Sequence, residues 1–433
     1  MNNIRPFQII LLGVFGLFAV FGLIYFGLYK GSGSGDPAYA GGVEIWGTVD
    51  GGAVRSVIEG LTSTVEGFGQ VRYIEKDPQS FNLELLNAIA EGRAPDLIVL
   101  ASDQMLTHRA KLFTMPYETL SERTYRDIYV DGTDIFLFPD GIYGLPFAVD
   151  LLVMYWNRDM FASFGIPNAP RTWETLVSEV VPKLTRVGSD LTISQSAIAF
   201  GEYANVSHAK EILSMLFLQS GTNIVEEKSG SYTVTIGERN EQGLPPATAA
   251  LSFYTQFALP TSATYSWNRA FASDRAAFTG GVLGTYFGFG SEYDSIERAN
   301  PNLNLDIQSV PQGVTANTYR GYGIFYAFSI PRAAGNPEGA YAAMQVLTEQ
   351  TTANKLAQAL RMAPVHRATI AAGTTDVNDQ VLYQAALISH GWLDPDSVGS
   401  TEVFRLMVED VTSGRSRVSD AVEDAIARLR LLF

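Results

Sequence analysis

The sequence predicts an α/β protein built around a doubly wound sheet. Short apolar runs alternate with stretches that carry the 3.6-residue periodicity of amphipathic helices. The start of the main body of the chain reads strand-helix-strand-helix-strand, an order typical of parallel α/β layers. The chain has 433 residues, of which 46% are hydrophobic and 17% charged, so it can form two or three domains with substantial cores.

The first five elements set this pattern. They are expected at Val43–Thr48 (strand), Ala53–Val65 (helix), Gln70–Glu75 (strand), Leu83–Glu91 (helix) and Leu97–Leu100 (strand). The first helix has its apolar residues on one face, and Gly92 ends the second helix. The third strand is a continuous apolar run, as expected for a strand covered on both faces.

Later segments continue the alternation. Two strands are expected at Ile142–Pro146 and Leu151–Tyr155, followed by a helix that Thr172 and Glu174 open. Further helices are predicted at Ala209–Ser220, Pro246–Phe257, Pro337–Thr348, Ala353–Leu360 and Ser419–Leu432.

The N-terminal segment resembles a membrane anchor. Phe7–Tyr29 is 23 residues without a charge, and a helix of that length rises about 34 Å. Residues 1–30 are therefore predicted to form a transmembrane helix, with the large domain outside the cytoplasm, and residues 31–42 a flexible Gly/Ser linker. The alternative is a signal peptide cut after Ala40, in Ala38–Ala40, but the apolar run exceeds the ~7–15 residues usual for such peptides.

Composition excludes several classes of function. The chain has 30 Lys and Arg residues and 45 Asp and Glu residues, and the resulting net charge of −15 argues against nucleic-acid binding. The absence of cysteine excludes thiolate catalysis, cysteine-based metal sites, disulfides and a lipid anchor on cysteine.

No catalytic motif is found. The four histidines are far apart in sequence, and neither a G-x-S-x-G elbow nor a phosphate-binding P-loop is present. Asp394–Gly399 begins like a calcium loop, but Val398 and Arg405 occupy ligand positions, so it is interpreted as a turn. We therefore expect no catalytic residue, metal or cofactor. A hydrolase that uses two of the many carboxylates is a minor alternative.

Aromatic residues next to small polar residues are the candidates for ligand binding. They occur in Trp46–Asp50, Tyr265–Asn268 and Tyr286–Ser291, and carboxylates follow strands at Asp103 and Asp150. In open α/β sheets, ligands bind beyond the carboxyl ends of strands. Aromatic faces and hydrogen-bond acceptors suit a neutral polyol.

Each candidate also has a structural interpretation. Any single aromatic residue can belong to the core, and Trp156 and Trp173 are expected there. Asp50 and Asp103 could cap helices, and Arg320 could grip an anion or pair with a carboxylate.

Ten segments, in order, carry a resemblance to a known family. They are Val43–Gly47, Leu86–Leu97, Ile142–Asp150, Met154–Phe161, Phe164–Pro167, Pro170–Glu174, Val310–Gln312, Ile330–Pro331, Asn336–Ala340 and Ala363–Val365. With them, Val43–Phe433 resembles the bacterial extracellular solute-binding proteins of the maltose-binding type, family 1, which serve ABC importers. Three features depart from the pattern: the missing lipoprotein cysteine, Trp156 where a Tyr is usual, and the unmatched stretch Gly313–Asn317.

The resemblance implies a two-lobed, type II periplasmic-binding-protein fold with a ligand cleft between the lobes. Lobe 1 would comprise residues 43–149 and 321–370, and lobe 2 residues 150–320 and 371–433. The positions that match the family's ligand contacts are Trp46, Asp50, Asp103, Asp150, Trp267, Phe289 and Arg320.

The resemblance also implies how the protein works. We expect a monomer at the plasma membrane that binds a sugar or oligosaccharide on the extracytoplasmic side and delivers it to ABC permease subunits, without enzymatic activity. The alternatives are a sensory or scaffolding domain that feeds no importer, a surface polysaccharide hydrolase, and a binding protein for peptides or polyamines.

Overall fold

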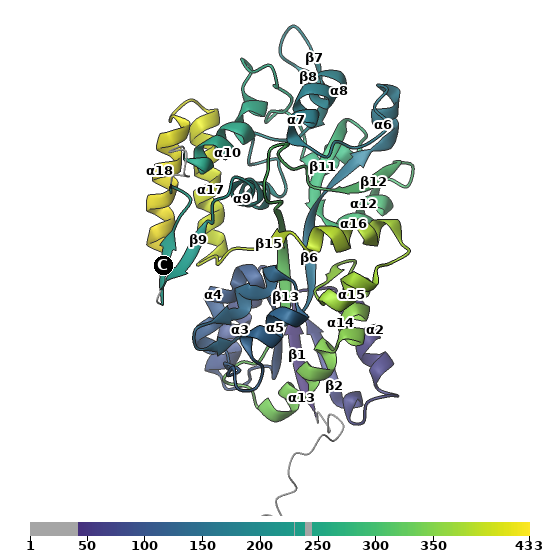
Figure 1. Ribbon diagram of the computed structural model, residues 1–433, viewed down its shortest axis with the longest axis vertical. Coiled ribbons are helices and arrows are strands. Elements are labelled where there is room, and N and C mark those ends of the chain that lie inside the picture. Colours follow the sequence, from purple (N-terminus) through teal and green to yellow (C-terminus); the bar gives the residue numbers. More distant parts are fainter. Residues whose placement is uncertain (1–41, 229, 239–244) are drawn as a thin grey trace, which may run out of the picture.

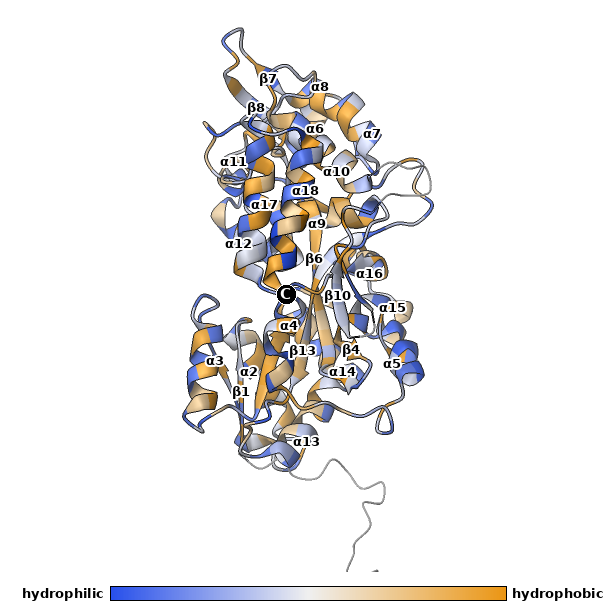
Figure 2. Cartoon of the chain, turned by 90° about the vertical axis from the view of Figure 1, so that its left-hand side faces the viewer, coloured by the Kyte–Doolittle hydropathy of each residue, from blue (hydrophilic) through white to orange (hydrophobic). Residues whose placement is uncertain are grey.

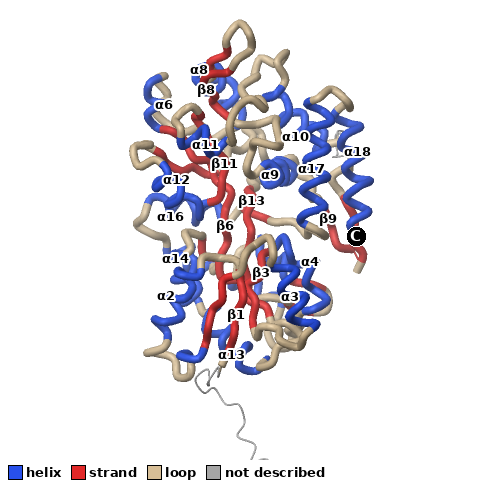
Figure 3. The backbone as a smooth tube through the Cα atoms, turned by 180° about the vertical axis from the view of Figure 1, so that it is seen from behind, coloured by secondary structure: helices blue, strands red, loops and turns tan. Residues whose placement is uncertain are grey.

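One long strand, β6 (Leu145–Asn157), runs through both halves of the molecule (Figure 3). The computed structural model describes residues 42–228, 230–238 and 245–433. From Leu145 to Leu151, β6 pairs with β13 (Gly321–Ser329), and from Leu152 to Trp156 it pairs with β11 (Leu283–Phe289). All 13 residues of β6 are buried. This strand therefore belongs to the sheets of two lobes, which Figure 1 shows one above the other.

Lobe 1 contains the first half of β6 and the N-terminal elements. Its strands are ordered β2-β1-β3-β13-β6, and the pairs β1–β2 and β1–β3 are parallel. The elements are β1 (Val43–Gly47), α2 (Gly51–Leu61), β2 (Val71–Glu75), α3 (Phe81–Ala90), β3 (Leu97–Ala101), α4 (Met105–His108), α5 (Glu122–Ile128), β4 (Leu137–Phe138), β5 (Gly141–Ile142), α13 (Pro337–Thr348), α14 (Gln350–Ala359), β14 (Ala363–Pro364) and α15 (Arg367–Ala372).

Lobe 2 contains the second half of β6, with β11, β8 and β7 on one side and β12 paired to β6. Its elements are α6 (Arg158–Ser163), α7 (Trp173–Thr175), α8 (Val181–Leu184), β7 (Arg186–Val187), β8 (Ile193–Ile198), α9 (Ala209–Gln219), β9 (Val225–Lys228), β10 (Ser231–Val234), α10 (Pro246–Thr255), α11 (Asp274–Thr279), α12 (Tyr293–Ala299), β12 (Leu305–Ser309), α17 (Ser397–Thr412) and α18 (Val418–Leu429). Between the lobes lie α16 (Val377–Ala386) and β15 (Ser389–His390), which pairs with β13.

Burial follows the sequence pattern. The central strands are mostly hydrophobic, whereas α18 shows hydrophilic and hydrophobic stripes (Figure 2). In α18 the buried residues are Ala421, Val422, Ala425 and Leu429, which lie on one helix face. In α2, Asp50 Oδ1 accepts a hydrogen bond from Ala53 N at 2.6 Å and caps the helix.

The β1-α2-β2-α3-β3 order that the sequence predicts is present. The prediction of two separate strands at 142–146 and 151–155 is wrong: Ile142 belongs to β5, and β6 runs without a break from Leu145 to Asn157. Asp150, which the sequence suggested as a strand end, is accommodated inside β6: Ser291 donates from its N to Oδ1 and from its Oγ to Oδ2. The helix predicted at 53–65 is shifted to Gly51–Leu61, since Asp50 fixes its start.

Within the described ranges, no helix is both long and apolar enough to cross a membrane. The predicted anchor at residues 1–30 and most of the predicted linker at residues 31–42 lie outside these ranges.

We expect Leu151→Ala to lower the free energy of unfolding by about 2–5 kcal/mol, because this fully buried side chain lies where β6 passes from one lobe to the other. Leu83→Ala, at a leucine that is 63% exposed on α3, is the matched control and should change it by less than about 0.5 kcal/mol. Urea unfolding measures the free energy of unfolding of both variants. Equal losses in the two variants would contradict the importance of β6 for stability.

Candidate functional site

The face of β13 that lies between the lobes carries two tyrosines and an isoleucine and is only partly covered. Side chains alternate along this strand, so Tyr322, Ile324 and Tyr326 share one face. Ile324 and Tyr326 keep exposed surface, although β13 lies between β3 and β6. Tyr326 is opposite Ala101 of β3, and Ile324 is opposite Asp150 of β6. We call Tyr322, Ile324, Tyr326, Asp103 and Asp150 the interlobe floor.

Two carboxylates flank Tyr326. Burial, and then the negative charges of Asp150 and Asp103, raise the pKa of the Tyr326 phenol well above its ordinary value. The structure thus brings together Asp103 and Asp150, two of the predicted ligand contacts, around one phenol that the sequence analysis did not select.

Asp103 immediately follows β3 and has an unsatisfied acceptor. It lies in a short 3-10 turn, Ser102–Gln104, and its Oδ1 is buried without a hydrogen-bond partner among the described residues. Burial raises the pKa of Asp103 to about 6; Lys210 opposes this shift, while Asp394 and Glu211 add to it. Because these three residues come from lobe 2, the carboxylate is positioned between the lobes.

Asp150 is 5% exposed, and Ser291 satisfies both of its oxygens, at 3.1 Å from the backbone N and 2.5 Å from Oγ. Burial raises the pKa of Asp150 to about 7, the bonds from Ser291 oppose the rise, and the charge of Glu292 adds to it. The carboxyl group therefore exchanges its proton near neutral pH.

The side of lobe 2 that faces Asp103 is built from α9 and the segment before α17. Lys210 Nζ donates to Asp394 Oδ2 at 2.5 Å and lies 5.7 Å from the centre of the Trp392 ring. Asp394 also accepts from Ser400 Oγ, and Asp396 caps α17 through Val398 N. The predicted turn at Asp394–Gly399 is thus a helix cap, in which Lys210 is the cation that Asp394 binds.

Two predicted aromatic contacts lie away from the floor. Trp46 aligns with Ile98, and because side chains alternate, it lies on the face of the sheet opposite Ala101 and Tyr326. Its Nε1 donates to Glu44 at 2.6 Å, and Lys76 Nζ is 3.7 Å above its ring. Trp267 has no exposed surface and stacks on Phe271 at 4.4 Å, so it offers no free face to a ligand in this conformation.

The other three predicted contacts lie next to the ends of strands. Asp50 caps α2 at the carboxyl end of β1. Phe289 ends β11 near Asp150, and its N donates to Glu292 Oε1 at 2.8 Å. Arg320 precedes β13, and its carbonyl accepts from the amide groups of Gln219 and Gln312.

The sequence analysis missed Tyr322, Tyr326, Lys210 and Glu211. Tyr322 and Tyr326 are four residues apart in Gly321–Ser329, so they share one face of a strand, but aromatic residues also occupy the other face. Lys210 was recognised only as part of a helix.

A hydrogen bond between Arg109 and Tyr232 joins the two lobes. Arg109 Nη1 of lobe 1 donates to the Tyr232 hydroxyl, on β10 of lobe 2, at 2.8 Å. Arg109 also binds Asp140 and lies 3.9 Å above the Phe138 ring, while Tyr232 stacks on Phe433. In Figure 1, β9 reaches down from lobe 2 towards α4.

Two α/β lobes that share β6, with polar groups converging between them, define a two-lobed solute-binding protein. The chain belongs to the bacterial extracellular solute-binding protein family, whose model matches residues 64–353, and this confirms the resemblance seen in the sequence.

Curated relatives are distant. Two proteins from Brucella abortus (strain 2308) and Brucella suis biovar 1 (strain 1330), both named as binding proteins, are each 22% identical to this chain over 296 residues. The match covers 66% of this chain, which spans about two thirds, 66%, of the length of these relatives.

Solved structures share the fold. A cyclo/maltodextrin-binding protein complexed with maltotetraose has a TM-score of 0.72 at 13% identity, over 92% of this chain and 98% of the other. A solute-binding protein from Thermotoga lettingae bound with α-D-tagatose has a TM-score of 0.67 at 17% identity, over 90% and 99%. The GacH receptor of Streptomyces glaucescens, solved unliganded and with acarbose, has a TM-score of 0.68 at 16% identity, over 90% and 97%. At these identities the likeness concerns the fold.

We expect the stability of the protein to fall, relative to Asp150→Asn, as the pH rises from 4 to 7. The native pKa of Asp150, about 7, lies above the ordinary value of 3.8, so in this window the native state holds a proton that the unfolded chain has released. The difference should reach up to about 4 kcal/mol, and urea unfolding at several pH values measures it. If the unfolding free energies of the two proteins change in parallel with pH, the raised pKa of the buried Asp150 carboxyl group is contradicted.

Proposed function

We propose that this protein captures a sugar or oligosaccharide outside the cytoplasm and delivers it to the permease of an ABC importer. The observation that carries the proposal is Asp103 Oδ1, a buried carboxylate oxygen between the two lobes that has no hydrogen-bond partner in the part of the chain that the structure describes. Leaving a buried acceptor unsatisfied is unfavourable by about 1–3 kcal/mol, so a ligand hydroxyl that binds there would remove this penalty.

The composition of the interlobe floor supports a polyol ligand. Asp103 supplies an acceptor, while Tyr326 and Ile324 supply partly exposed apolar surface beside it. A sugar presents both hydroxyl donors and C–H-rich faces to such a site. The sugars bound by the three structurally similar proteins are consistent with this choice of ligand class.

Binding would be coupled to closure of the lobes. We propose that the halves move as units along the predicted boundaries, 43–149 with 321–370 and 150–320 with 371–433, and that β6 and β13 bend between them. A ligand favours closure only by its greater affinity for the closed state. We propose that the Arg109–Tyr232 hydrogen bond, which joins the two lobes in this conformation, is kept in the closed state and lost when the lobes open further.

We also propose that Phe7–Tyr29 anchors the protein in the plasma membrane, with the binding domain outside. The run of 23 uncharged residues supports this anchor. The sequence also contains no cysteine to which a lipid could be attached. Recovery of the full chain from carbonate-washed membranes supports this anchor, and release into the soluble fraction argues for cleavage after Ala40.

A second ligand class is favoured by the excess of acidic groups. Asp103, Glu211 and Asp394 interact electrostatically near a single Lys210, an arrangement that would also attract an amine such as a polyamine. The alternative of a sensory domain, which would bind either ligand without delivering it to an importer, would use this same site. A polysaccharide hydrolase would convert its ligand, whereas a binding protein releases it unchanged.

We expect one sugar in a panel of sugars, amino acids, peptides and polyamines to raise the unfolding temperature saturably. At 100 times the dissociation constant the stabilisation should be about 2.7 kcal/mol. Asp103→Asn should weaken binding by about 10-fold or more, since hydrogen bonds to charged groups contribute about 1.5–3 kcal/mol. Titration calorimetry measures this.

The matched control for that variant is Asp127→Asn, at a carboxylate that is 73% exposed on α5, and it should leave the affinity unchanged. If a polyamine is the ligand that stabilises the protein, the assignment of the binding site stands and the proposal of a sugar ligand is wrong. Equal affinities of the two variants would reject the role of Asp103.

We expect Tyr232→Phe to weaken solute binding by about 2- to 10-fold, because it removes the hydroxyl that accepts from Arg109 across the lobes. Tyr319→Phe, at an exposed tyrosine, is the control. Calorimetry decides, and an unchanged affinity in Tyr232→Phe would remove this contact from the closure mechanism.

A further inference from the structure

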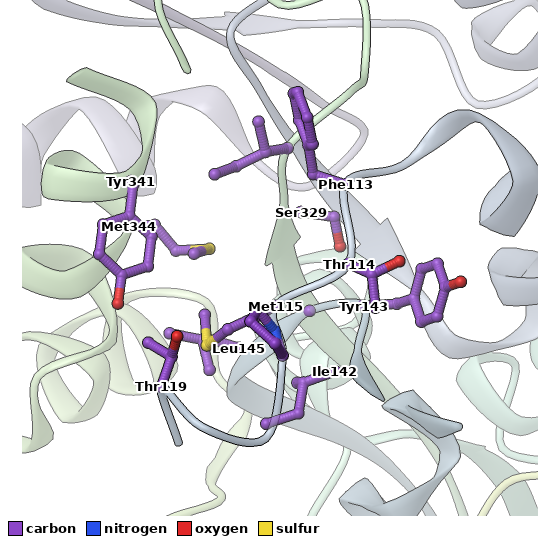
Figure 4. A pocket seen from close by; sticks show the side chains of 13 residues that line it. Phe113, Thr114, Met115, Thr119, Ile142, Tyr143, Leu145, Ser329, Tyr341 and Met344 are labelled. Atoms are coloured by element: carbon purple, nitrogen blue, oxygen red, sulfur yellow. The ribbon is translucent and has the colours of Figure 1, made fainter. Parts of the chain in front are cut away.

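Lobe 1 contains a pocket of about 280 Å³ that is separate from the interlobe floor (Figure 4). It lies between the segment 113–119, the start of β6, the end of β13 and α13. Its lining is mostly apolar and includes Met115, Ile142, Leu145, Ile330, Tyr341 and Met344. No charged side chain is among the residues that line it, so an occupant would be neutral.

The walls of this pocket are fixed by backbone hydrogen bonds. Phe113 N donates to Ile330 O at 2.8 Å, and Met115 and Ile142 exchange two bonds of 2.8 Å each. Strand and helix segments form the remaining walls. These bonds fix the shape of the pocket.

A hydroxyl group without a partner faces this space. Ser329 is 1% exposed, and its Oγ has no hydrogen-bond partner among the described residues. In Figure 4 this oxygen points into the space between Phe113 and Met115. Gly144 makes room for it, since a Cβ at that position would lie 2.8 Å from Ser329 Oγ. A buried hydroxyl in this state gains free energy from any ligand oxygen that reaches it.

The position of Ser329 separates the two sites. Tyr326 lies three residues away, and side chains alternate along β13, so Ser329 is on the opposite face of the sheet. A ligand in this pocket would not occupy the interlobe floor.

We propose that this pocket binds a small, neutral six-membered-ring compound that carries one oxygen, such as a phenol. An apolar cavity of about 150 Å³ holds benzene, so a volume of 280 Å³ accepts a substituted ring. The sulfur atoms of Met115 and Met344 are favourable contacts for an aromatic ring. Ser329 Oγ donates a hydrogen bond to the phenol oxygen.

The test is a fluorine NMR titration of the purified full chain with 4-fluorophenol. We expect saturable binding. Thr119→Trp, which places an indole at the exposed rim of the pocket, should weaken it by at least about 10-fold, equivalent to about 1.4 kcal/mol. Ser329→Ala should weaken the binding of 4-fluorophenol by about 2- to 10-fold. It should leave the binding of 4-fluorotoluene, which lacks the oxygen, unchanged.

Two controls keep the result specific. Thr375→Trp adds an indole at an exposed position outside the pocket lining, and Asp103→Asn alters the interlobe floor. Neither variant should change the affinity for 4-fluorophenol. No saturable binding, or binding that Thr119→Trp leaves intact, overturns the proposal. Equal losses for both compounds in Ser329→Ala overturn the role of its hydroxyl group.

Discussion

The structure depends on one constraint: β6 must satisfy its hydrogen bonds in two sheets at once. Its first half pairs with β13 and its second half with β11, so the position of each lobe is tied to the same strand. Where the register shifts, between Tyr326 and Ala327, Pro146 lies opposite and has no N–H to donate. The closure that we propose would therefore bend β6, because this strand is paired in both lobes.

This constraint explains the chemistry between the lobes. Asp150 is the one charged residue of β6, and Ser291 compensates its burial where the strand passes from one sheet to the other. Asp103 follows the end of β3, beside the same face of β13, and within the described ranges its Oδ1 has no hydrogen-bond partner. The two carboxylates thus have different surroundings: Asp150 accepts two hydrogen bonds from Ser291, and Asp103 Oδ1 is the acceptor to which we propose that a solute binds.

Much of the fold could be predicted, and less of the site. Periodicity located β1, α2, β2, α3 and β3, because each buries one face or is buried on both. The continuity of β6 could not be foreseen, since a charge inside an apolar run looks like its end until Ser291 is seen beside it. Trp46 and Trp267 had suitable neighbours, but only register and packing decide which face a ring occupies. Tyr326 was hidden because aromatic residues alternate on both faces of β13.

The most direct test is the distance between the lobes with and without solute. The chain has no cysteine, so Gln79→Cys in lobe 1 and Ser189→Cys in lobe 2, both exposed, can carry two spin labels and no others. Double electron–electron resonance should show the distance distribution shortening when the solute that stabilises the protein is added, and Asp103→Asn should require more solute for the same change. An identical distribution in the free and saturated protein would contradict capture by closure of two lobes about β6.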